Sequence, residues 1–163
     1  MTPTQNAALA ALVGRALTQD EATAIDGYLP ARRDDLIAAL LSTGRTEVAP
    51  RMTSARGIAE RVSGGPVAAE VILLKLEGAR DAMLASADQQ QHVMGSLLRR
   101  QLTFLAGEGL DFGSAALRGM LDQFASAGIL TSGEVDALKA IAVRPAPIST
   151  SQVSDALNAA EGG

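Results

Sequence analysis

The strongest constraint on the fold of this chain is the regular recurrence of helix-start signals. At several places a Ser or Thr is followed three positions later by Glu or Gln, among them Thr18 with Glu21, Thr131 with Glu134, and Ser149 with Gln152. This spacing allows a capping box, in which the two side chains satisfy free backbone N–H groups at a helix start. Apolar residues follow each signal at helical spacing, so the pattern predicts a series of short helices.

Gly and Pro residues mark the remaining helix boundaries. We expect helices that begin at Thr4, Thr18, Ser114, Thr131 and Ser149, and others over residues 32–42, from Thr53 or Ser54 to 62, over 66–84 and over 88–106. Residues 45–51 should form an extended connector or one short strand. The fold class is therefore predicted to be all-α, a compact multi-helix domain of about eight or nine short-to-medium helices with at most a minor short β pairing.

The break at Ser63-Gly64-Gly65-Pro66 predicts the domain organisation. It separates an N-terminal helical half, residues 1–63, from a C-terminal helical half, residues 66–160, which is built on two long helices. The length of the chain fits one domain, so the halves are expected to form one compact domain overall. The helix over 66–84 is apolar on most sides and should be the central one.

Two segments of similar sequence, residues 49–54 and 146–151, each begin with Ala-Pro and end with Thr-Ser. Two interpretations stay open at this point. The segments either pair as extended strands or resemble each other by coincidence.

Composition excludes several functional classes. The chain has no Cys among its 163 residues, which excludes disulfide scaffolds, thiolate catalysis and Cys-ligated zinc. Its net charge of −4 argues against nucleic-acid binding, which normally requires a basic face. No apolar run approaches the roughly 18 residues that span a membrane, and residues 1–6 lack the basic start of a signal peptide. We therefore expect no nucleic-acid partner, no membrane partner and a cytoplasmic site of assembly.

A search for reactive side chains finds few candidates. His92 is the only imidazole, and Asp88 lies four residues before it on an expected helix. Two ligands do not make a metal site, so a surface Asp–His pair is the preferred interpretation. An enzyme would most plausibly use Asp88, His92 and Arg99.

Other sequence patterns have structural explanations. Asp111-Phe112-Gly113 matches a kinase triplet by letters only and predicts a turn in which Phe112 packs and Ser114 caps the next helix. The acidic pairs at residues 20–21 and 34–35 lie in first helical turns, where the helix dipole favours negative charge. We therefore predict that the protein is not an enzyme, has no catalytic, cofactor-binding or metal-binding residue, and needs no cofactor.

The two arginine doublets are the candidate partner contacts: Arg32, Arg33, Arg99 and Arg100. Arg is enriched at the energetic centres of protein interfaces. Arg99 and Arg100 lie in the middle of an expected helix, so at least one of them should be exposed. The alternative is that these arginines only belong to a solvent-exposed helix face and bind no partner.

The C-terminal half resembles a known group of proteins. It resembles small, poorly characterised helical proteins encoded in the structural gene modules of tailed bacteriophages. The similar segments are the stretch from Glu108 through Asp122, then Ala127-Gly128-Ile129-Leu130-Thr131, the run Glu134 to Ala140, and the ending 153–158. The resemblance covers residues 40–160 loosely and 105–158 better. Its motifs are caps, turns and apolar stripes.

What the resemblance implies is a non-enzymatic virion structural or assembly accessory protein of the neck, tail or capsid. Its partners would be other virion proteins and further copies of itself, and its location would be the virion, assembled in the host cytoplasm. The alternative is a cytoplasmic helical adaptor or regulatory binding protein unrelated to virions. An adaptor of this kind would present one groove sized for a helix or peptide.

Overall fold

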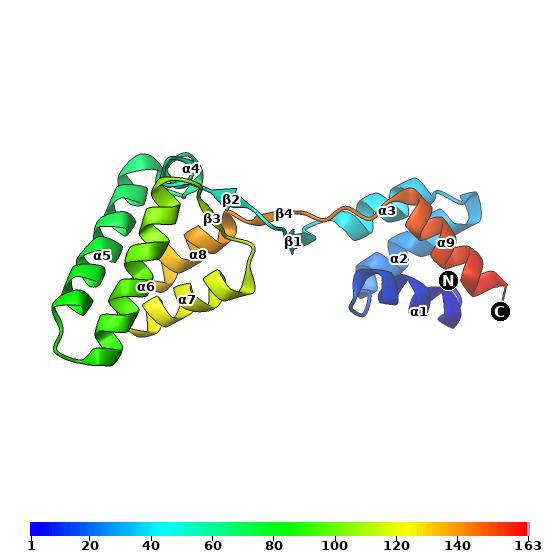
Figure 1. The fold of residues 1–163 in the computed structure, drawn as a ribbon. Coiled ribbons are helices and arrows are strands. Elements are labelled where there is room, and N and C mark those ends of the chain that lie inside the picture. The colour runs from blue at the N-terminus through cyan, green and yellow to red at the C-terminus, as the bar shows by residue number, and fades with distance from the viewer. Residues whose placement is uncertain (163) are drawn as a thin grey trace. The chain divides into compact units, whose positions relative to one another are not determined.

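Nine α-helices make up most of the part of the chain that the computed structural model describes, residues 1–162. They are α1 (Pro3–Val13), α2 (Gln19–Tyr28), α3 (Asp34–Ser42), α4 (Ala55–Arg61), α5 (Gly65–Ala85), α6 (Gln89–Ala106), α7 (Ala115–Ser126), α8 (Ser132–Ala140) and α9 (Thr150–Glu161). A short 3-10 helix, η1 (Leu29–Ala31), follows α2. Figure 1 shows the order of these elements along the chain.

Sheet structure is limited to two short antiparallel pairs within the described residues. Strand β1 (Thr46–Val48) pairs with β4 (Val143–Pro145), and β2 (Met52–Thr53) pairs with β3 (Leu110–Asp111). With 69% of the structure helical, the expected all-α class with a minor β pairing is confirmed. The two Ala-Pro segments take different partners, since Met52 lies opposite Asp111 while Ala146 donates its N–H to the Arg45 carbonyl.

The helix starts follow the capping signals of the sequence. All three expected capping boxes form, at Thr18, Thr131 and Ser149. A fourth box joins Thr2 to Gln5, so α1 begins at Pro3 and not after Thr4. Proline is favoured at the first helical position because its missing N–H would have no partner there.

The chain divides into two units, and their boundaries differ from the expected halves. Unit 1 comprises residues 1–47 and 145–163, and unit 2 comprises residues 48–144. The expected division at residues 63–66 falls inside unit 2, because Ile58 and Val62 of the α4 region pack into the same core as Ile72 of α5. The last helix belongs to the first unit.

The core of unit 1 combines both ends of the sequence. Leu9, Ile25 and Ile37 are fully buried, and so are Val153 and Leu157 of α9. Helix α9 packs against α1 and α3. Without α9 these apolar side chains would face water, so the C-terminal helix is part of the fold of the N-terminal unit.

The core of unit 2 is formed by the long α5–α6 hairpin together with α4, α7 and α8. Helix α5 contributes Ala69, Ile72 and Leu76, and α6 contributes Gly95, Leu98 and Leu105. The expectation that α5 is buried on most sides is wrong. Only one face of α5 is covered, and Val67, Val71 and Leu74 are exposed.

Candidate functional site

The α5–α6 hairpin carries exposed apolar side chains that point away from the core of unit 2. Val67 is 76% exposed and Leu74 56% on α5, and Val93 is 60% and Phe104 43% exposed on α6. Leu74 lies two positions from both Ile72 and Leu76, and a two-residue step turns a side chain about 200° around a helix. Leu74 therefore points away from the core, and Val67 shares its stripe seven positions earlier.

The same geometry gives α6 an exposed stripe of its own. Arg100 lies two positions from Leu98 and Leu102, which face the core, so its side chain points outward. Phe104 follows it at four positions and Val93 precedes it at seven, the spacing of one helical stripe. We call these two exposed stripes, Val67 and Leu74 on α5 and Val93, Arg100 and Phe104 on α6, the outer face.

The charge of α6 distinguishes it from the rest of the chain. Its 18 residues contain two arginines and no Asp or Glu, in a protein whose net charge is −4. Arg99 and Arg100 are both exposed, as expected for at least one of them. Within residues 1–162, no ion pair involves either guanidinium. An unpaired cation among exposed apolar side chains has the composition of an interface contact.

A groove beside the outer face runs between α6 and α7. It has a volume of about 540 Å³ and is lined by residues that include Met94, Leu97, Gln101, Ala115, Gly119 and Met120. Methionine side chains adapt to varied partners, and Ala and Gly allow close approach of another backbone. The groove is open along its length and mostly apolar, features that suit a peptide or a helix.

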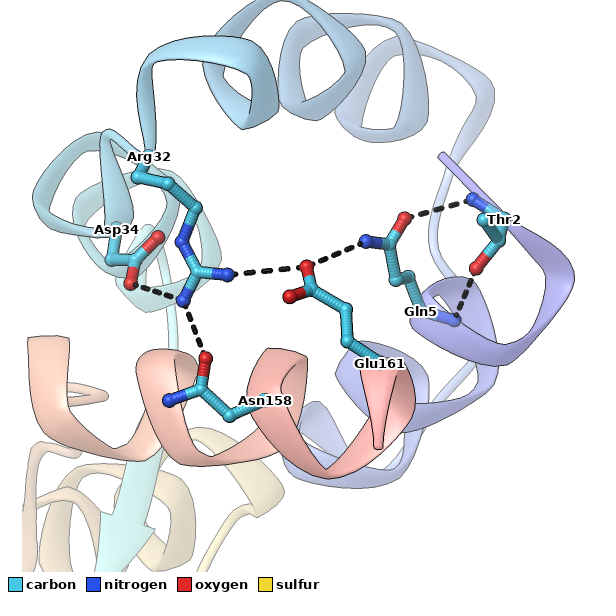
Figure 2. Close-up of polar contacts among 6 residues, drawn as sticks. All are labelled: Thr2, Gln5, Arg32, Asp34, Asn158 and Glu161. Atoms are coloured by element: carbon cyan, nitrogen blue, oxygen red, sulfur yellow. Dashed lines mark hydrogen bonds and ion pairs between the residues drawn. The ribbon is translucent and has the colours of Figure 1, made fainter. Parts of the chain in front are cut away.

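Arg32 is part of a polar cluster within unit 1 (Figure 2). Its Nη1 lies 3.1 Å from Oε1 of Glu161, and its Nη2 lies 2.9 Å from Oδ1 of Asn158 and 3.3 Å from Oδ2 of Asp34. Gln5 of α1 donates to the same Glu161 oxygen. Arg32 therefore joins α9 to the turn before α3, which is a structural role.

Arg33 is also paired, but only locally. Its guanidinium binds both oxygens of Asp35, two residues away, at 3.0 and 2.9 Å. Hydrogen bonding to Arg33 lowers the pKa of the Asp35 carboxyl, and Asp35 in turn raises the pKa of Arg33. The structure thus places the two doublets in separate units, and of these four arginines only Arg99 and Arg100 form no ion pair within the described residues.

Asp88 and His92 are each engaged by backbone groups. The Asp88 carboxylate caps α6 by accepting from the N–H groups of Gln90 and Gln91 at 2.8 and 3.3 Å. Nδ1 of His92 lies 3.0 Å from the carbonyl oxygen of Leu84. These contacts hold the loop between α5 and α6, and no ion pair joins the two side chains within the described residues.

The Asp111-Phe112-Gly113 segment forms the expected turn. Phe112 is buried in the unit 2 core, and Ser114 caps α7 by accepting from the N–H of Leu117. Asp111 accepts hydrogen bonds from the N–H groups of Arg51 and Gly113 at 2.6 and 2.9 Å. The Asp111 carboxylate therefore links this turn to the strand β2 region.

Two ion pairs fix helices at the edge of unit 2. Lys75 of α5 lies 2.6 Å from Oε1 of Glu134, and Lys139 of α8 binds Asp122 of α7. Hydrogen bonds from Lys75 and from the Thr131 backbone lower the pKa of the Glu134 carboxyl. In the part of the chain that the structure describes, no three metal-ligating side chains gather, and no helix is long and apolar enough to cross a bilayer.

The outer face was not among the sequence candidates, apart from Arg100. The signal that could have revealed it is the excess of apolar positions around α5, which exceeds what one buried face requires. Comparison of the chain with protein-family models, with curated proteins and with solved structures finds no match.

Proposed function

We propose that this chain is a non-enzymatic accessory protein of a bacteriophage virion that works through protein–protein contacts. The observation that carries the proposal is the outer face of the α5–α6 hairpin, where Val93 and Phe104 share an exposed stripe with Arg100, which forms no ion pair within residues 1–162. Monomeric proteins rarely leave contiguous apolar surface in water, and such patches mark interaction sites. The virion setting comes from the resemblance of residues 105–158 to phage structural-module proteins.

The composition of the surface supports binding of a protein more than binding of a small molecule. Interface centres are poor in acidic residues and rich in aromatic side chains and Arg, and α6 supplies Phe104 and Arg100 with no acidic residue. The proposed partners are other virion proteins and further copies of this chain. The proposed location is the virion, after assembly in the host cytoplasm.

Mass spectrometry of purified particles tests the proposal. Particles of a phage that encodes the chain should contain its peptides in a fixed ratio to the major capsid protein. A host cytoplasmic protein of similar abundance serves as the control for carry-over. If the chain remains in the lysate supernatant while capsid peptides pellet, the virion role is wrong.

The groove between α6 and α7 favours a second candidate, a cytoplasmic helical adaptor or regulator unrelated to virions. Its volume of about 540 Å³ and its mostly apolar lining, with Met94, Leu97 and Met120, suit a bound helix. Substitution of Ala116, an exposed groove residue on α7, by Arg should weaken binding to such a partner. The same substitution should leave packaging into particles unchanged if the outer face is the virion contact.

A further inference from the structure

Unit 1 is built from two segments that lie far apart in the sequence, whereas unit 2 is one continuous segment. Residues 1–47 and 145–163 form unit 1, and residues 48–144 between them form unit 2. The core of unit 1 needs both segments, because Leu9 comes from the first and Val153 from the second, and both are fully buried. Unit 1 can therefore fold only when its two segments are brought together.

The ends of unit 2 are held next to each other. The Ala49 N–H donates to the Ala142 carbonyl at 2.9 Å, close to the two ends of the continuous segment, and both side chains are buried. The same antiparallel pairing continues in unit 1, where the Ala146 N–H donates to the Arg45 carbonyl at 3.1 Å. For the two segments of unit 1, a folded unit 2 is therefore equivalent to a very short linker.

The length of chain between two segments determines how easily they meet. An unfolded unit 2 would be a flexible loop of about 100 residues, and the probability that the ends of such a loop meet falls roughly as the 3/2 power of its length. We infer that folded unit 2 holds unit 1 closed, so that unfolding of unit 2 releases α9 and opens unit 1.

The dependence of one unit on the other runs in a single direction. The core of unit 2 consists of residues between Ala55 and Ala142, all within its own continuous segment. Its closure therefore does not require unit 1 to be folded. The inference concerns the stability of unit 1 and does not depend on the proposed virion role.

Tyr28 allows the unfolding of unit 1 to be followed separately. It is the single Tyr of a chain without Trp, and it lies in α2 against the core of unit 1. Its fluorescence during urea titration of the full-length protein therefore reports on unit 1. Leu138→Asp places a carboxylate in the core of unit 2 and should unfold that unit, which loss of hydrogen-exchange protection in α5 to α8 verifies. The folding equilibrium constant of unit 1 should then fall by about 10- to 100-fold.

A disulfide at the ends of unit 2 separates chain closure from other effects. The two hydrogen bonds of this antiparallel pairing place residues 48 and 143 opposite each other as a non-hydrogen-bonded pair, the type in which side chains lie closest. Val48 is 48% and Val143 38% exposed, so their replacement leaves both cores intact. Since the chain has no Cys, Val48→Cys with Val143→Cys can form one intramolecular disulfide. When oxidised, it should restore most of the stability that Leu138→Asp removes from unit 1, and reduction should abolish this rescue.

The reverse experiment tests the direction of the dependence. Leu157→Asp disrupts the core of unit 1 and should leave the hydrogen-exchange protection of α5 to α8 unchanged. Leu138→Ala, a milder change that leaves unit 2 folded, should not shift the Tyr28 transition. An unshifted Tyr28 transition in Leu138→Asp would overturn the inference, and so would an oxidised disulfide that fails to restore unit 1. None of these outcomes affects the particle experiment.

Discussion

Nη1 of Arg32 lies 3.1 Å from Oε1 of Glu161, a contact between residues 129 positions apart in the sequence. Arg32 makes this contact from a left-handed backbone conformation, with φ at +48°. It is the single residue other than glycine with a positive φ among residues 1–162. The strain of that conformation is offset by three side-chain contacts that hold the C-terminal helix in unit 1.

Replacement of Arg32 by Ala should loosen α9. We expect a loss of about 1 kcal/mol of stability, since charge-assisted hydrogen bonds are lost at a partly exposed site. Arg32→Gly should be less harmful than Arg32→Ala, because glycine adopts a positive φ without strain. Hydrogen exchange of the α9 amides measures the loss of stability in both variants. Arg33→Ala is the matched control and should leave α9 protection unchanged, because Arg33 pairs only with Asp35.

Glu21 should make the stability of unit 1 depend on pH. Arg15 binds both carboxylate oxygens at 2.6 and 2.8 Å, and with the Thr18 N–H it lowers the pKa of Glu21 from 4.5 to about 2. A depressed folded-state pKa adds stability above the unfolded value of 4.5 and loses it as the pH falls towards 2.

Thermal unfolding over this pH range measures the effect. Glu21→Gln should lower the melting temperature of unit 1 above pH 4.5, and the difference from wild type should shrink as the pH falls towards 2. Asp20→Asn, in the same helical turn, is the control and should change the pH profile less. A constant difference between wild type and Glu21→Gln at all pH values would contradict the assignment.

The two units should unfold separately when their cores are damaged. Leu157 is fully buried in the core of unit 1, and Leu138 is 2% exposed in the core of unit 2. Replacement of either by Ala should cost about 2–5 kcal/mol. Leu157→Ala should reduce hydrogen-exchange protection in α1, α3 and α9, and Leu138→Ala in α5 to α8. Equal loss of protection throughout the chain in both variants would indicate a single cooperative unit.

Gly113 should be intolerant of a side chain. A Cβ at this position would lie 2.2 Å from the carbonyl oxygen of Ala49, an approach that no rotamer relieves. We expect Gly113→Ala to destabilise unit 2 by about 3 kcal/mol or more. Gly119→Ala lies in α7 with open space around it and should stabilise the helix by roughly 0.5–1 kcal/mol. Chemical denaturation of the two variants checks this contrast.

The sequence by itself determined the local structure of this protein. Capping boxes, Gly and Pro positions and apolar spacing depend on contacts within a few residues, so the all-α class and most helix boundaries could be predicted. The turn at residues 111–114 and the exposure of at least one of Arg99 and Arg100 were predicted on the same basis.

Only the tertiary structure decided which helices share a core. Helix α9 packs with α1, and α4 belongs to unit 2, because of contacts between residues far apart in the sequence. The apolar stripe of a helix does not specify which other helix will cover it. Arg32 looked like a surface contact but is held by Asn158 and Glu161. Leu74 and Phe104 looked like core residues but are exposed, because unit 2 has no helix to cover the outer side of α5 and α6 within residues 48–144.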